Sequence, residues 1–195
     1  MIDKIKWCYN ALPVLKEDNY RWSNSWTSIH DIGIYNGHKF TYKEYKKTEK
    51  AYVDLIVSIF KYVGAKKIKL IHFDHGITPP IAKYDKDGML KKWYQRVSNH
   101  MSLSLDDIQY IVPLILRENI WGTLYHKRTR TYVRFGYDYY VYVNSPSFYH
   151  HSETDVYFNI DIERMVSQYG LFIEYDYLDE RSRNYIENNV LPTQK

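Results

Sequence analysis

The stretch Thr131-Tyr-Val-Arg-Phe-Gly-Tyr-Asp-Tyr-Tyr-Val-Tyr-Val143 decides the fold because it predicts a β-hairpin. Valine, phenylalanine and tyrosine crowd it, and these side chains fit a pleated, half-buried surface. Gly136 can adopt a positive φ and Asp138 accepts turn geometry, so we expect the chain to reverse direction there. Alternation then places the valines with Phe135 and Tyr139 on a core-facing side, and the remaining tyrosines with Arg134 on the other side.

The neighbouring segments extend this hairpin into a meander. Ile120–Tyr125 predicts a preceding strand, which the basic turn His126–Arg130 connects to the hairpin. Three antiparallel strands are therefore expected in succession in the C-terminal half of the chain. Residues 144–147 break the sheet with a proline between serines, and residues 150–154 are expected to form a polar loop.

The clearest helix is predicted over Tyr42–Val63. Thr41 and Glu44 have the spacing of a capping box, in which each side chain accepts a hydrogen bond from the other residue's backbone N–H. Apolar residues then recur every three or four positions on one face. Gly64 follows, where helices commonly end in a left-handed residue. Ile68–Phe73 then alternates as a strand that we expect to pack beneath this helix.

Two more helices and a last strand are expected further along the chain. Ser104 opens a helix with an apolar stripe, and Pro113 inside that helix predicts a kink or a break. A third helix is predicted from about Ile160 to Tyr169, followed by a strand over Leu171–Tyr175. Met89–Val97 fits either a strand or a short helix.

This order of elements predicts one α+β domain over residues 1–195. We expect a mostly antiparallel sheet with a meander in the C-terminal half and two to three helices packed on one side. The tryptophan-rich residues 1–30 are expected to form a strap over the body of the domain, and residues 178–195 a polar tail. A chain of 195 residues is long enough to bury a core without disulfides.

The composition fits a soluble cytoplasmic protein. Hydrophobic residues make up 45% and charged residues 26% of the chain. Cys8 is the one cysteine, so an intramolecular disulfide is impossible, which fits a reducing compartment. There is no signal-peptide pattern and no apolar run near the ~20 residues of a membrane helix. The net charge of +4 is mild compared with that of a dedicated nucleic-acid binder.

His72, Asp74 and His75 are the first candidates for chemistry. On a regular strand His72 and Asp74 share a face and could hold a metal ion, as in a small metal-dependent nuclease or other hydrolase. Metal sites need three or four ligands in defined geometry, and no second cluster has a diagnostic spacing. We favour the alternative that these are ordinary polar residues at the end of a strand.

Other polar groups are weaker candidates for catalysis. His150 and His151 lie beside Glu153 and Asp155, a combination that could serve acid–base chemistry but also fits a solvated loop. Cys8 has no neighbour that would lower the pKa of its thiol. The chain lacks a phosphate-binding glycine loop, a serine nucleophile elbow and a zinc-protease motif. We therefore predict a protein that is not an enzyme and that binds no cofactor or metal.

The basic residues around the meander offer a different kind of site. Lys127, Arg128, Arg130 and Arg134 lie beside tyrosines that alternation places on the surface, and Tyr and Arg are enriched at the hot spots of protein interfaces. The same residues could form a solvated turn that keeps a sheet edge from aggregating. Arginine with aromatic rings also binds single-stranded nucleic acid. We give equal weight to a protein interface and to a solvated turn, and less weight to binding of nucleic acid.

Four segments between Trp26 and Tyr175 carry a resemblance to a known family. They are Trp26-Thr-Ser-Ile-His-Asp-Ile-Gly33, Phe40-Thr-Tyr-Lys-Glu-Tyr45 with Glu49 and Tyr52, Leu116-Arg-Glu-Asn-Ile-Trp121, and Val133-Arg-Phe-Gly-Tyr-Asp-Tyr-Tyr-Val-Tyr142. Together they resemble small bacterial immunity proteins that are encoded beside polymorphic toxins, including those of contact-dependent growth inhibition systems.

The resemblance implies a protein that binds the C-terminal domain of a cognate toxin, often a nuclease, and occludes its active site. It implies no small-molecule substrate and no membrane association. Because they share the exposed hairpin, we expect the contacts to come from Arg134, Tyr137, Asp138, Tyr140 and Tyr142. An inhibitor of a host defence protein, encoded by a mobile element, would use the same mechanism on a different partner.

The net charge of the chain bears on which kind of toxin the resemblance implies. Many immunity proteins against nucleases are acidic, whereas this chain carries a net charge of +4. Either a local acidic patch at Asp176, Asp179 and Glu180 contacts the toxin, or the toxin is not a basic nuclease.

Overall fold

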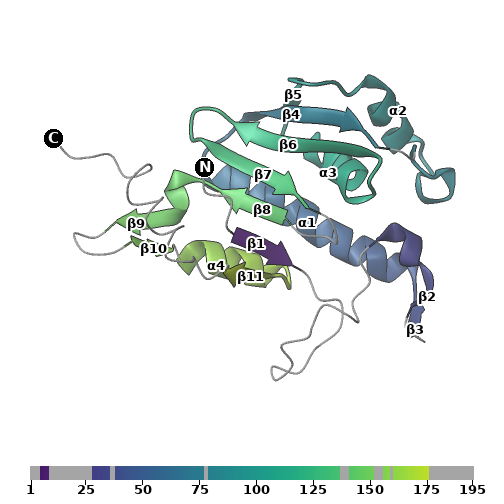
Figure 1. Ribbon diagram of the computed structural model, residues 1–195, viewed down its shortest axis with the longest axis horizontal. Helices are drawn as coiled ribbons and strands as arrows, with labels where there is room; N and C mark the ends of the chain where they lie inside the picture. The colour runs from purple at the N-terminus through teal and green to yellow at the C-terminus, as the bar shows by residue number, and fades with distance from the viewer. Residues whose placement is uncertain are drawn as a thin grey trace.

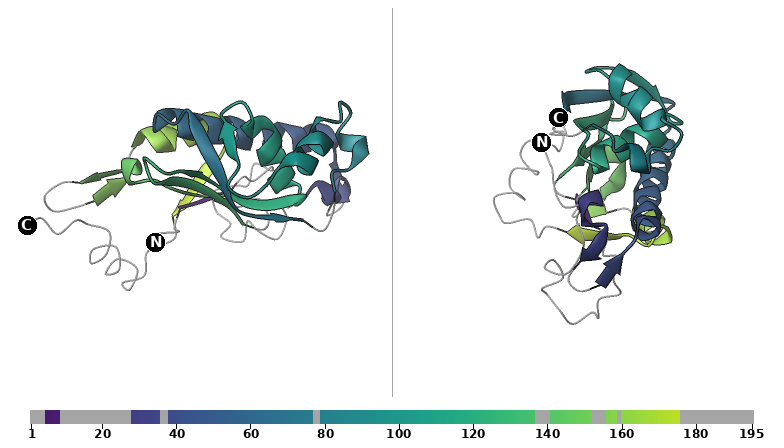
Figure 2. Two further views of the ribbon diagram at one scale, coloured as in Figure 1. Left: turned by 90° about the horizontal axis from the view of Figure 1, so that it is seen from above. Right: turned by 90° about the vertical axis from the view of Figure 1, so that its right-hand side faces the viewer.

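An antiparallel sheet runs through the molecule, and the helices cover one of its faces (Figures 1 and 2). The computed structural model describes residues 5–8, 28–35, 38–76, 79–136, 141–151, 156–158 and 160–175. Within these residues the sheet has seven strands in the order β11-β1-β8-β7-β6-β4-β5, and all neighbouring strands are antiparallel. The predicted α+β fold is therefore confirmed.

The strands of this sheet come from both ends of the described chain. They are β1 (Ile5–Cys8), β4 (Lys67–His75), β5 (Ser102–Ser104), β6 (Ile120–His126), β7 (Thr131–Phe135), β8 (Val141–Asn144) and β11 (Phe172–Tyr175). Two small hairpins lie outside it, namely β2 (Gly33–Tyr35) with β3 (His38–Phe40) and β9 (Tyr149–His151) with β10 (Val156–Phe158).

The predicted meander is formed by β6, β7 and β8. In the hairpin β7–β8, Tyr132 pairs with Asn144 and Phe135 pairs with Val141. Val133 and the valines of β8 are buried, as the alternation predicts, because their side of the sheet faces the helices. Residues 137–140, which include the predicted turn residues Tyr137 and Asp138, lie outside the described residues.

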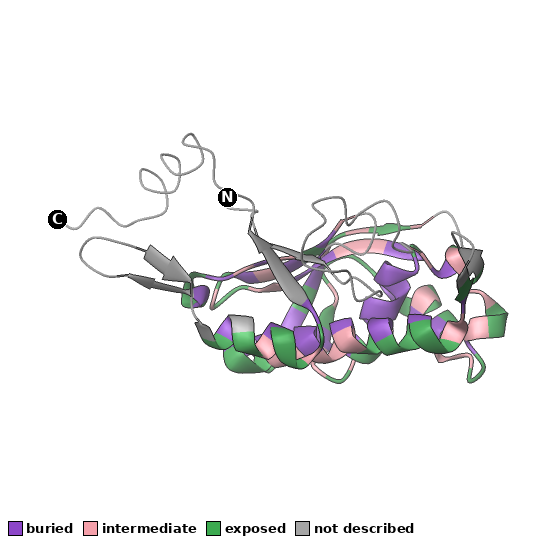
Figure 3. Ribbon diagram, turned by 90° about the horizontal axis from the view of Figure 1, so that it is seen from below, coloured by how far each residue is buried: buried purple, intermediate pink, exposed green. Residues whose placement is uncertain are grey.

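The helices pack together on one side of the sheet. They are α1 (Tyr42–Tyr62), α2 (Met89–Arg96), α3 (Ile108–Leu116) and α4 (Ile160–Gln168), with short 3-10 helices η1 (Ile29–Asp31), η2 (Ala82–Tyr84) and η3 (Pro146–Phe148). Buried and exposed residues alternate along the helices in Figure 3, as amphipathic helices on a sheet require.

Helix α1 forms where the sequence predicts it. The Glu44 N–H donates to Thr41 Oγ1 at 3.3 Å, and the Thr41 N–H donates to Glu44 Oε2 at 2.7 Å, which completes the capping box. The Thr41 hydroxyl also donates to Glu44 Oε2 at 2.7 Å, and this bond, followed by the bond from the Thr41 N–H, lowers the pKa of Glu44. Gly64 has a φ of 70°, the left-handed conformation expected just beyond the helix. The buried stripe of α1 includes Tyr45, Tyr52 and, unexpectedly, Glu49.

Three local expectations need correction. Ile5–Cys8 form β1, which lies inside the sheet between β8 and β11, whereas we expected an irregular strap. Tyr149–His151 pair with Val156–Phe158 where a polar loop was expected. Helix α3 begins at Ile108, because the hydrogen bonds between Ser104 and Asp107 cap a turn that precedes the helix.

The ambiguous segment after residue 88 is helical, as α2. Both carboxylate oxygens of Asp85 accept backbone N–H groups of this helix, from Leu90 at 2.9 Å and from Lys91 at 2.8 Å. Asp85 therefore satisfies two of the donors that a helix leaves unpaired at its N-terminus. Pro113 lies within α3 and is buried.

We expect Gly76→Ala to lower the free energy of unfolding by about 3 kcal/mol or more. A Cβ at residue 76 would overlap the backbone carbonyl oxygen of Glu118 and lie 2.8 Å from backbone atoms of Asn119, which cannot rotate away. Gly122→Ala is the control, because its Cβ would meet the flexible side chain of Leu70, so a loss of about 1 kcal/mol is expected. Urea unfolding measures both, and equal losses would contradict the argument.

Candidate functional site

The face of the sheet opposite the helices is the first candidate site. In antiparallel pairs, residues directly opposite one another share a face. Tyr125 pairs with Tyr132, and Thr123 pairs with Arg134, which in turn pairs with Tyr142. Because these residues alternate with buried valines and leucines, their side chains lie on the side away from the helices.

Strand β4 adds cations to this surface. Lys69 pairs with Tyr125, and Lys67 lies two residues earlier on the same side of β4. We use the term open sheet face for Lys67, Lys69, Trp121, Tyr125, Tyr132, Arg134 and Tyr142. Its three cations are exposed and its four aromatic residues are half-buried. Asp74, which pairs with Trp121, brings a carboxylate to one end.

Hydroxyl groups fix the base of the meander beside this face. Thr131 Oγ1 donates to Ser145 Oγ at 2.8 Å, and both residues are fully buried. Thr129 Oγ1 lies 2.8 Å from Thr131 Oγ1 and 2.7 Å from His126 Nδ1. Burial, and then the positive charge of Arg128, lower the pKa of His126. The basic turn is thus anchored to buried groups at the foot of β7 and β8.

The structure places two of the predicted contact residues together. Arg134 and Tyr142 are directly opposed on β7 and β8. The other three, Tyr137, Asp138 and Tyr140, lie outside the described residues. The acidic residues Asp176, Asp179 and Glu180 also lie outside them.

The candidate metal ligands of β4 do not lie on a regular strand. His72 has a φ of 52°, and the pairing of β4 with β6 shifts register between Ile71 and Asp74. The strand alternation that would place His72 and Asp74 on one face is therefore interrupted. The His75 ring packs edge-on against Phe73, with centroids 5.0 Å apart. The described residues contain no group of three or more His, Cys, Asp or Glu that could hold a metal.

The remaining candidates are only partly described. His150 and His151 belong to β9, and Cys8 belongs to β1. Glu153 and Asp155 lie outside the described residues. The predicted combination of His150 and His151 with Glu153 and Asp155 therefore stays a prediction.

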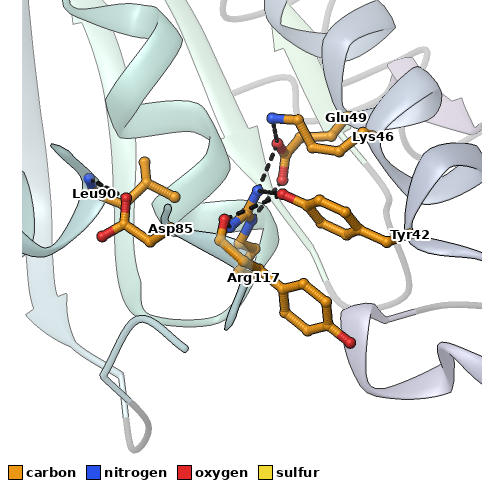
Figure 4. Close-up of polar contacts among 7 residues, drawn as sticks. Tyr42, Lys46, Glu49, Asp85, Leu90 and Arg117 are labelled. Atoms are coloured by element: carbon orange, nitrogen blue, oxygen red, sulfur yellow. Dashed lines mark hydrogen bonds and ion pairs between the residues drawn. The ribbon is translucent and has the colours of Figure 1, made fainter. Parts of the chain in front are cut away.

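A buried ion pair that the sequence analysis missed joins α1 to the end of α3 (Figure 4). Arg117 Nε donates to Glu49 Oε2 at 2.6 Å, and Arg117 Nη2 donates to Glu49 Oε1 at 2.9 Å. Arg117 is 4% exposed and Glu49 is fully buried. A bidentate charge-assisted pair of this kind is both strong and geometrically specific.

Three further groups complete this cluster. Lys46 Nζ donates to Glu49 Oε1 at 2.6 Å. Arg117 Nη1 donates to the Tyr84 carbonyl at 3.1 Å, and Nη2 also donates to the Tyr42 hydroxyl at 3.4 Å. Burial acts to lower the pKa of Arg117, but the hydrogen bonds and charge of Glu49 outweigh it and raise that pKa. Arg117 is therefore a permanent cation.

A cleft of about 300 Å³ opens beside this cluster, between α1, α2 and α3. Its lining combines charged, aromatic and apolar side chains. The lining residues are Tyr42, Lys46, Tyr84, Asp85, Lys86, Asp87, Met89, Leu90, Gln109, Tyr110, Pro113 and Arg117. The cleft lies on the helical side of the molecule, away from the open sheet face.

The sequence did contain a signal for the buried pair. Glu49 falls on the apolar stripe of α1, between Tyr45 and Tyr52, where a charge needs a partner. The segments that carry the family resemblance contain both Glu49 and Arg117, 68 residues apart. Nothing local in the sequence identifies Arg117 as the partner.

Comparison with protein-family models, with curated proteins and with solved structures finds no match for this chain. Among the described residues, no helix combines the length and the apolar character that crossing a bilayer requires.

We expect Arg117→Met to lower the free energy of unfolding by about 3–5 kcal/mol, because Glu49 would be left buried opposite Lys46 alone. Glu49→Met should cost a similar amount by isolating Arg117. The double variant should be more stable than either single variant, since it removes both charges. Urea unfolding of the four proteins in a double-mutant cycle measures the coupling, and additive losses would contradict a tightly coupled pair.

Proposed function

We propose that this protein is a cytoplasmic immunity protein that binds the C-terminal domain of a cognate toxin and blocks its active site without turnover. The open sheet face is the contact surface. Its support is one structural observation: four half-buried aromatic residues and three exposed cations lie on adjacent strands, on the face of the sheet opposite the helices. Aromatic residues and arginine are the side chains that dominate protein interfaces.

The geometry suits occlusion of another macromolecule. Hydrogen bonds between neighbouring strands β4, β6, β7 and β8 fix the distances between the side chains of this face. The face is therefore a preorganised surface. Preorganisation lowers the entropy lost on binding, because the backbone beneath the contact residues is already ordered. A broad, stiff surface can cover the entrance of an active site in a partner protein.

The charges indicate the chemistry of the partner. Lys67, Lys69 and Arg134 are exposed, so this face complements an acidic surface. Such charges mainly accelerate encounter and select the partner, while the aromatic residues hold the complex. The expected toxin domain therefore presents carboxylates around its active site and is not strongly basic, which agrees with the net charge of +4 on this chain.

The test is co-expression with the toxin encoded by the adjacent gene. Arg134→Glu and Tyr142→Ala should each weaken the complex by about tenfold or more, because hot-spot losses reach ~2 kcal/mol, and should abolish protection of the cell. Lys47→Glu is the matched charge reversal on the exposed side of α1 and should leave binding unchanged. Affinity is measured by calorimetry and protection by growth.

Two outcomes would contradict the proposal. One is an adjacent gene product that is harmless by itself or that forms no complex in gel filtration. The other is tight binding of single-stranded RNA or DNA that Tyr142→Ala weakens, since aromatic rows with cations also form stacking surfaces for bases. That result would assign the open sheet face to nucleic acid instead.

A further inference from the structure

The cleft between α1, α2 and α3 has an unusual floor. Arg117 lines it while being 4% exposed, and Glu49 lies fully buried behind it. Lys46 reaches the same carboxylate from the rim, with its side chain 46% exposed. A nearly dry charge cluster is thus in contact with a space that a ligand could enter.

The hydrogen bonds of the cluster leave donors at this floor. A guanidinium has five N–H donors and an ammonium has three. In the described part of the chain, Arg117 uses four of them, on Glu49 twice and once each on Tyr84 and Tyr42. Lys46 uses one, on Glu49. One guanidinium N–H and two ammonium N–H groups are left to meet an acceptor from outside.

The charges of the cluster do not cancel. Two cations, Lys46 and Arg117, share the single carboxylate of Glu49, which leaves one positive charge in excess. Charge interactions are strong where water is scarce, so an anion in the cleft would be attracted to this excess. The arrangement of the cluster therefore favours an acceptor that is itself negatively charged.

The rim limits how much negative charge the cleft accepts. Asp85, Lys86 and Asp87 all line it. The backbone N–H of Met89 lowers the pKa of Asp87, and Lys46 is close enough for its charge to contribute to lowering the pKa of that carboxyl. Both oxygens of Asp85 accept N–H groups of α2. With Lys86 between them, the two aspartates give the rim one net negative charge, which opposes a dianion such as phosphate more strongly than a monoanion.

The walls define the rest of the ligand. The rings of Tyr42 and Tyr84 stack with centroids 4.6 Å apart, and Tyr110, Leu90 and Pro113 add aromatic and apolar surface. A volume of about 300 Å³ lies at the lower end of the range for small-molecule sites. A compact body with an aromatic ring or a short aliphatic chain suits such walls.

We propose that this cleft binds the carboxylate of a small organic monoanion with an aromatic or aliphatic body. The carboxylate accepts hydrogen bonds from Arg117 Nη1 and Lys46 Nζ, and the body lies against Tyr42 and Tyr84. This site goes beyond the sequence expectation, which was that the protein has no small-molecule substrate. It lies on the helical side, so it stands independently of the proposed toxin contact. The carboxylate could belong to a free acid or to a peptide C-terminus.

The test titrates the intact protein with 3-phenylpropionate, its uncharged amide and inorganic phosphate, and follows amide chemical shifts by NMR. We expect saturable binding of 3-phenylpropionate at about 1 mM or tighter, and at least tenfold weaker binding of the amide and of phosphate. Lys46→Met should weaken binding of the acid about tenfold, because it removes the excess charge and leaves the Glu49–Arg117 pair intact. Lys47→Met, the neighbouring exposed lysine outside the cleft, should bind as the parent protein does.

A second pair of probes separates the two sources of the carboxylate. A short peptide ending in phenylalanine is titrated with its C-terminus free and amidated. Binding tighter than that of 3-phenylpropionate, lost on amidation, assigns the site to a peptide C-terminus, and weaker binding assigns it to a free acid. The proposal is overturned if no acid saturates, if the amide or phosphate binds as well as the acid, or if Lys46→Met binds like the parent protein.

Discussion

The bidentate bond between Glu49 and Arg117 is the constraint on which the helical side of this protein depends. It connects α1 to the end of α3, and through the Tyr84 carbonyl it also fixes η2. A buried ion pair is tolerated only when its remaining hydrogen-bonding groups are satisfied, because desolvation is costly. The Tyr42 hydroxyl and the Tyr84 carbonyl supply those partners. The positions of all three segments are thereby tied to one carboxylate.

This arrangement leaves the sheet with two different faces. The helices, held together around α1, bury the valines and leucines of one face (Figures 2 and 3). In the part of the chain that the structure describes, no helix packs on the other face, which carries tyrosine, arginine and lysine. Exposed residues such as Arg134 alternate along each strand with buried residues such as Val133. Packing of the buried residues in the core therefore also fixes the positions of the exposed ones. A rigid surface for recognition follows from the packing beneath it.

Local signals explain what the sequence could predict. The β7–β8 hairpin and α1 were predictable because alternation, a capping box and helical periodicity lie within short windows. The place of β1 was not, because Ile5–Cys8 is too short for a pattern and its partners are Val141–Asn144 and Phe172–Tyr175. The bulge at His72 was also hidden, since a positive φ on histidine has no distinctive sequence signature. Arg134 and Tyr142 could be paired in advance only because one hairpin contains both.

The cleft beside Arg117 could not be predicted, and its chemistry depends on Lys46. Lys46 shares a helix with Glu49, but Tyr84 and Arg117 come from segments that meet it only in the folded chain. With Glu49 and Arg117 alone, the pair would be neutral and closed, a structural tie between two helices. Lys46 adds a second cation to the same carboxylate and lies partly in solvent. The position of this one exposed lysine therefore converts a structural ion pair into a cluster with excess positive charge and donors that face the cleft.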